Sequence, residues 1–221
     1  MTEVQALVLH ASRLALVALL AGMVWRVRVR QCLAFGSYVV AALLGNTLVW
    51  LWPSRFFTPE FWVVKQGVYD ILKAAVALEL AWRAFRAFPG ALRTARVVLL
   101  ALLGMSSVAL AAVPTRPAYA VVWEWQPAVA TAGLWLLTAT ALMVVWYQIP
   151  LSGWHRAIML GLAVYLLVFV TLLGLLKSRG WAIGTFVATA ESTVYLALVA
   201  FWAWQAWRRD PVAAAALKRA A

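Results

Sequence analysis

Four ionisable residues lie inside otherwise apolar stretches of the sequence and are the first candidates for chemistry: Arg13, Asp70, Lys73 and Glu191. Their charges sum to zero. Asp70 and Lys73 are three positions apart, so on one helix their side chains lie about 60° apart and can pair. If these stretches cross a bilayer, each ionisable group costs about 2.5–3.5 kcal/mol on insertion scales and usually faces the bundle interior. The pattern predicts a buried ion pair, or a site for a proton or a small solute.

Hydrogen-bonding side chains at comparable positions extend this candidate site: His10, Asn46, Gln66, Tyr69 and Tyr195. Arg13 has no acid in its own stretch, so we expect it to reach Asp70 or Glu191, with His10 on the same helix face. The alternative is that the charges only fix helix packing. Each polar residue alone is more often an interhelical hydrogen bond than a ligand.

Signatures of an enzyme or a metal site are missing from the sequence. Cys32 is the only cysteine, and His10 and His155 are the only histidines, which excludes disulfide frameworks and cysteine-based zinc sites. No G-x-S-x-G, phosphate loop or H-E-x-x-H occurs, and the last apolar stretch has no lysine for a retinal Schiff base. We expect no cofactor, no metal and no enzymatic activity, although intramembrane chemistry through Asp70 and Glu191 stays an alternative.

The composition predicts the class of protein in which these residues are positioned. The 221 residues are 66% hydrophobic and 12% charged, against about 45–50% and about 25% in soluble domains. The mean hydropathy is +0.90. A chain this short cannot hide so much apolar surface in one core, so the sequence predicts an integral membrane protein without a soluble catalytic domain.

Charge and turn clusters separate the apolar residues into stretches of about 20, the length that crosses a bilayer as a helix. Glu79 lies one turn before Arg83, near the end of the third stretch, and we expect these two to form an i,i+4 pair. The predicted fold is an all-α membrane protein, a single transmembrane domain over 1–221 with seven helices: 5–25, 32–52, 61–82, 97–114, 125–146, 156–176 and 184–206.

Basic residues between these spans and near their ends predict the orientation. Twelve Lys and Arg fall on the side that holds the C-terminus and five on the other, so the positive-inside rule places the N-terminus outside and the C-terminus in the cytoplasm. Most of the 14 tryptophans fall near span ends. We expect a bacterial inner membrane, with the net charge of +12 meeting anionic lipid head groups at the cytoplasmic face rather than nucleic acid. A homo-oligomer is left open.

An internal repeat is indicated by Ala81-Trp82-Arg83 and Ala203-Trp204-Gln205, at an offset of 122. It predicts a 3+1+3 plan with repeats at about 5–86 and 125–208 and a linker helix at about 97–114. This topology is similar to that of the SWEET sugar transporters and their PQ-loop relatives. The chain has no Pro-Gln dipeptide, so no residue of that family is carried over. In composition the chain resembles uncharacterised seven-span membrane proteins of GC-rich bacteria.

The functional hypothesis is a central polar pocket that moves or binds an unknown small molecule, coupled to a proton through Asp70 or Glu191. The rival hypothesis is a structural or sensory membrane subunit whose buried charges serve helix packing only. The two differ in whether water reaches the polar cluster.

Overall fold

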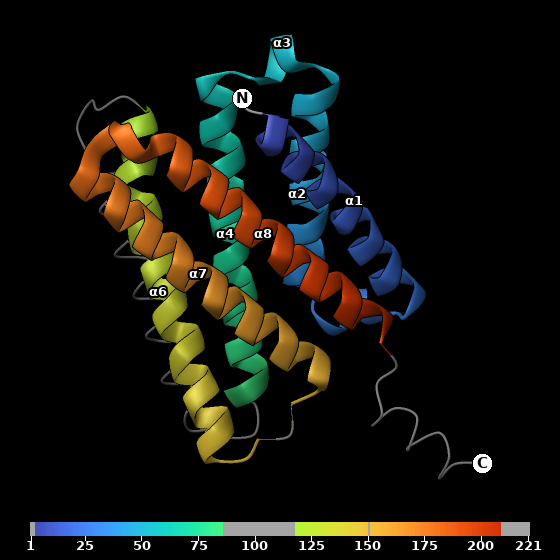
Figure 1. Cartoon of the computed structure of the whole chain (residues 1–221). Coiled ribbons are helices and arrows are strands. Elements are labelled where there is room, and N and C mark those ends of the chain that lie inside the picture. The colour runs from blue at the N-terminus through green and yellow to red at the C-terminus, as the bar shows by residue number, and fades with distance from the viewer. Residues whose placement is uncertain (1–2, 86–117, 150, 209–221) are drawn as a thin grey trace.

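The computed structural model of the chain describes residues 3–85, 118–149 and 151–208. Every regular element in these ranges is a helix (Figure 1). The six long helices are α1 Glu3–Trp25, α2 Leu33–Leu51, α4 Pro59–Phe85, α6 Ala118–Trp146, α7 Gly153–Arg179 and α8 Gly184–Trp207. Three short elements connect them: η1 Arg28–Gln31, α3 Pro53–Phe56 and η2 Gly180–Ile183. The all-helical prediction is confirmed for the described residues.

Helices cover six of the seven predicted spans, and the fourth, 97–114, lies outside the described residues. Four stretches are long and apolar enough to cross a membrane: Gln5–Trp25, Leu33–Leu51, Gln126–Trp146 and the 55-residue stretch Gly153–Trp207, which contains both α7 and α8. Helix α4, the third predicted span, is not among them. Its charged residues, Lys65, Asp70, Lys73 and Glu79 among them, interrupt every apolar window.

The long helices pack in a ring in which each contacts the next along the described chain, and α8 closes the ring against α1. The α1–α8 pair is parallel. Gln5 donates a hydrogen bond to Thr189 at 3.1 Å near the start of both helices, and the Trp207 indole donates to the Ala18 carbonyl at 3.0 Å nearer their ends. Helix α4 therefore has neighbours on both sides, α2 and α6, despite its charges.

The core inside the ring is aromatic and tightly packed. Phe35 of α2 contacts the rings of Trp202 and Trp154 edge-on, at centroid distances of 4.8 and 5.7 Å. The Trp202 indole donates a hydrogen bond to the Ala157 carbonyl at 3.2 Å. A Cβ at Gly161 would lie 2.7 Å from Trp202 Nε1. Helices α7 and α8 approach this closely because Gly161 has no side chain.

The outer surface of the ring is apolar. Leu14, Trp135, Val145 and Trp146 are each at least 70% exposed. So many large apolar side chains in solvent contact are rare on a soluble monomer and typical of a surface that faces lipid. The ring thus presents a largely apolar exterior.

Candidate functional site

Asp70 and Lys73 form the predicted pair. The Lys73 ammonium lies 2.6 Å from Asp70 Oδ1, and the side chain of Lys73 is only 6% exposed and that of Asp70 only 3%. Gln66, one turn before Asp70, donates an amide hydrogen bond to the same oxygen at 3.3 Å. Consecutive turns of α4 place all three on one face, so the sequence spacing alone accounts for this part of the site.

Lys73 also lies against aromatic rings of α7. Its ammonium is 5.2 Å from the Phe169 ring centroid and 6.0 Å from that of Tyr165. A buried ammonium is stabilised by a carboxylate and by aromatic faces together. Lys73 therefore faces inward beside Asp70, as predicted.

Glu191 enters the interior from α8 and accepts a hydrogen bond from the Tyr165 hydroxyl at 3.0 Å. It forms no ion pair with any described residue, but the charges of Lys73, Lys65 and Asp70 act on its carboxylate. The two acids share one region of the interior but have different partners. Asp70 has a cation in contact, whereas Glu191 has a neutral hydroxyl.

Four tyrosines from four helices surround these charges. Tyr165 and Tyr195 meet edge-on at a centroid distance of 5.9 Å, as do Tyr38 and Tyr69 at 6.2 Å. Tyr195 and Tyr69 were predicted, whereas Tyr38 and Tyr165 were missed. Tyrosine within an apolar span was the signal that could have identified both.

Tyr69 contacts α2 rather than Asp70. Its hydroxyl lies within hydrogen-bond distance of the Ala41 and Ala42 carbonyls, at 3.4 and 3.3 Å. A Cβ on Gly45 would lie 2.3 Å from that hydroxyl, so a glycine is needed for this approach. Asn46 is partly exposed on α2 and takes part in none of the contacts of the cluster.

A small cavity of about 10 Å³ lies beside the ion pair. This is about the volume that one water molecule requires. Asp70 Oδ2 is buried and has no hydrogen-bond partner among the described residues. Besides the ion pair, the cavity is lined mainly by small residues of α4 and α6 and by one leucine of α7: Ala74, Val129, Ala130, Gly133 and Leu166.

The prediction that Arg13 reaches Asp70 or Glu191 is wrong. The Arg13 guanidinium instead lies 5.1 Å from the Trp50 ring centroid, and its Nη1 is 3.4 Å from Nδ1 of His10. The shared face of His10 and Arg13 is confirmed. Position in the sequence predicts the depth of a residue in a span but not the side of the helix on which its partner lies, so equal depth did not bring Arg13 to the acids.

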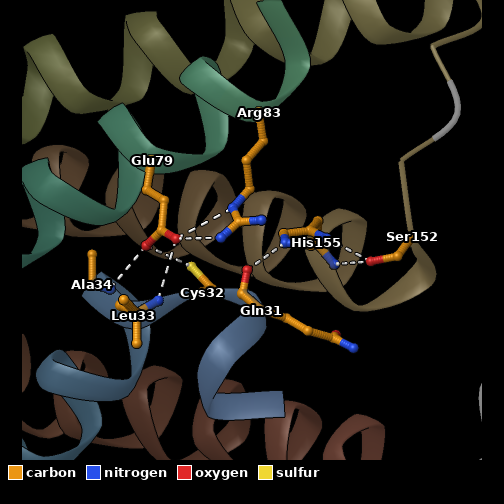
Figure 2. A network of polar contacts seen from close by, with 8 residues as sticks. All are labelled: Gln31, Cys32, Leu33, Ala34, Glu79, Arg83, Ser152 and His155. Atoms are coloured by element: carbon orange, nitrogen blue, oxygen red, sulfur yellow. Dashed lines mark hydrogen bonds and ion pairs between the residues drawn. The ribbon is translucent and has the colours of Figure 1, made fainter. Parts of the chain in front are cut away.

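A second polar network joins α4 to the start of α2 (Figure 2). Glu79 pairs with Arg83 at 2.8 Å, as predicted, and also accepts backbone N–H hydrogen bonds from Leu33 at 3.2 Å and Ala34 at 2.8 Å. The Cys32 thiol donates to it at 3.4 Å. A carboxylate at these positions caps the helix N-terminus and opposes its dipole. The spacing of Glu79 and Arg83 could not show this contact between helices.

His155 of α7 contacts Gln31, next to the start of α2, at the same end of the bundle (Figure 2). Its Nε2 lies 2.9 Å from the Gln31 carbonyl, which can only accept, so this nitrogen carries a proton. Nδ1 then accepts from the Ser152 hydroxyl at 2.5 Å, while that oxygen caps α7 by accepting from the His155 backbone N–H. Both His155 nitrogens are occupied by structural hydrogen bonds.

No group of three His, Cys, Asp or Glu within the described residues could hold a metal ion. The fold and the apolar exterior define a class: an all-helical protein with several helices long and apolar enough for a membrane. The sequence matches no protein-family model, and no curated protein or solved structure is significantly similar to it. The interior cluster therefore carries the functional argument.

Proposed function

We propose that the chain is an integral protein of the bacterial inner membrane with seven spans, its N-terminus outside and its C-terminus in the cytoplasm. The parallel α1–α8 pair supports this count. Helices α1, α2 and α4 alternate in direction, as do α6, α7 and α8, and α4 points the same way as α6 (Figure 1). The end of α4 and the start of α6 therefore lie at opposite ends of the bundle, which is what the predicted span 97–114 requires.

The same directions support the proposed 3+1+3 plan. The first, second and third helices of one triplet run in the same directions as the corresponding helices of the other. This is the arrangement expected of two parallel repeats around a linker span. The basic residues between and after the helices supply the orientation through the positive-inside rule.

For the activity, we propose that the central cluster binds a proton or a small polar solute. The observation that carries this proposal is that two carboxylates from different helices lie in one region: Asp70 of α4 pairs with Lys73, and Glu191 of α8 is hydrogen-bonded to Tyr165, whose ring centroid lies 6.0 Å from the Lys73 ammonium. Buried acids and bases inside membrane bundles mark ion, proton and solute paths. Asp70 Oδ2 is buried and receives no hydrogen bond from the part of the chain that the structure describes. Leaving a buried oxygen unpaired has a cost that a role in packing alone does not explain.

Within this cluster, Glu191 is the proposed proton-exchanging group. Asp70 is paired with Lys73 at 2.6 Å, so protonation of Asp70 would break an ion pair. Among the described residues, Glu191 accepts a hydrogen bond only from the neutral Tyr165 hydroxyl and forms no ion pair, and it is partly exposed. Protonation of Glu191 therefore breaks no ion pair there.

Infrared difference spectroscopy on the full chain in lipid vesicles tests this assignment, because a protonated carboxyl has its own C=O stretch. On acidification we expect a carboxyl band that disappears in Glu191→Gln and persists in Asp70→Asn. Glu60→Gln, which changes an exposed acid at the start of α4, is the matched control and should retain it. An unchanged band in Glu191→Gln would overturn the proposal.

The rival function, a structural or sensory subunit, is favoured by one observation. The ion pair is nearly inaccessible, and the adjoining cavity has room for about one water molecule. If the pair serves only packing, proton flux into reconstituted vesicles under an imposed potential should be equal for wild type and Glu191→Gln. A lower flux in Glu191→Gln would argue against this rival.

A further inference from the structure

The environment of Arg13 differs from that of the charged residues of α4. Lys73 forms an ion pair with Asp70, and Glu79 forms one with Arg83. The Arg13 guanidinium instead contacts an imidazole and an indole, with His10 Nδ1 at 3.4 Å and the Trp50 ring centroid at 5.1 Å. His10 itself meets Trp50 edge-on at 6.1 Å. Neither contact neutralises a positive charge.

The guanidinium lies near one end of the bundle. Side chains on a helix tilt toward its N-terminus, which carries the long Arg13 side chain toward the start of α1. Trp50, which it contacts, is the penultimate residue of α2. A long basic side chain that ends beside a tryptophan near a helix end has the geometry of a group reaching toward the membrane–water boundary.

The surface around this cluster is apolar and faces outward. Leu7, Leu14 and Val17 of α1 are 72%, 72% and 51% exposed, and Trp50 is 54% exposed. His10 is exposed as well. A ligand here would have its charge against Arg13 and an apolar part along α1.

We propose that Arg13, His10 and Trp50 form a binding site for the phosphate group of a phospholipid, in the leaflet at the end of the bundle where α1 begins. A planar guanidinium donates several hydrogen bonds to phosphate oxygens. Trp50 holds the guanidinium in place, and His10 occupies Nη1 and leaves Nη2 for the ligand. The acyl chains lie along the exposed leucines of α1, which a free phosphate ion could not use.

Native mass spectrometry of the full chain, purified and titrated with defined lipids, tests this site. The probes are phosphatidylglycerol and phosphatidylcholine, which share the phosphate, and a diglucosyl diacylglycerol, which lacks it. Both phospholipids should be retained by the wild-type protein. Arg13→Gln should weaken their retention about tenfold, since a charge-assisted hydrogen bond is lost, and should leave the glycolipid unaffected.

Arg55→Gln is the matched control. Arg55 is an exposed arginine in α3, near the end of α2, and its guanidinium lies 5.7 Å from the Phe56 ring centroid. It should retain both phospholipids like wild type. Arg13→Lys, which keeps the charge, should recover part of the retention and separates lost binding from a fold defect.

Four results would overturn the proposal. The first three are equal retention by Arg13→Gln and wild type, equal loss in Arg55→Gln, and thermal stabilisation of delipidated wild type, but not of Arg13→Gln, by inorganic phosphate alone. The third would indicate a site for a soluble anion. Retention of the glycolipid as strongly as the phospholipids would show that the apolar flank binds acyl chains without Arg13, and would also contradict it.

Discussion

At the scale of single residues, the two oppositely charged pairs within α4 could be predicted and the partners on other helices could not. Asp70–Lys73 and Glu79–Arg83 follow from helical spacing, which is a local property. Arg13 meeting Trp50 depends on how α1 is rotated against α2. The polar residues of α1 do not define one face, so the sequence left that rotation open.

The ion pair gives a prediction at this scale. Asp70→Asn leaves the Lys73 ammonium buried without a counter-charge, which we expect to cost about 3–5 kcal/mol. Thermal unfolding of the purified protein should show a large loss for Asp70→Asn and substantial recovery in Asp70→Asn/Lys73→Met. A small loss in the single variant would mean that water reaches the pair and would contradict an enclosed site.

At the scale of elements, hydropathy alone located the helices, but not the contacts that fix their ends. The start of α2 has no capping side chain of its own; the cap comes from Glu79, 45 residues after Ala34. Arg28 likewise donates to the carbonyls of Gln205 and Arg208 at the end of α8, both at 2.5 Å. Such contacts satisfy backbone groups that a helix end leaves unpaired, and they depend on tertiary structure.

The α7–α8 contact gives the prediction at this scale. In Gly161→Ala the new Cβ would lie 2.7 Å from Trp202 Nε1 and 2.8 Å from Leu198 Cδ1. Trp202 is fully buried and hydrogen-bonded, so it cannot yield, and we expect a loss of about 1–3 kcal/mol. Gly174→Ala, on the same helix with nothing within 4 Å, should be neutral or slightly stabilising in the same unfolding assay. Equal effects of the two changes would contradict this packing.

At the scale of the whole molecule, the ring buries the Asp70–Lys73 pair and exposes many large apolar side chains, the reverse of a soluble protein. Composition predicted this arrangement because lipid-facing surface has to be apolar whatever the topology. The closure of the ring by a parallel α1–α8 pair was not predicted, since hydropathy contains no information on which spans are neighbours. The parallel pair also supports the proposed crossing by residues 86–117, which can be tested directly.

Cysteine labelling tests the crossing and the orientation together, because Cys32 is the only cysteine and is buried. In a Cys32→Ser background, Ser54→Cys marks the α2–α4 end of the bundle and Arg156→Cys marks the start of α7; both positions are exposed. A membrane-impermeant maleimide added outside should label Ser54→Cys directly, and Arg156→Cys only after the membrane is opened. The opposite pattern would invert the proposed orientation, and labelling of both positions from one side would show that residues 86–117 do not cross.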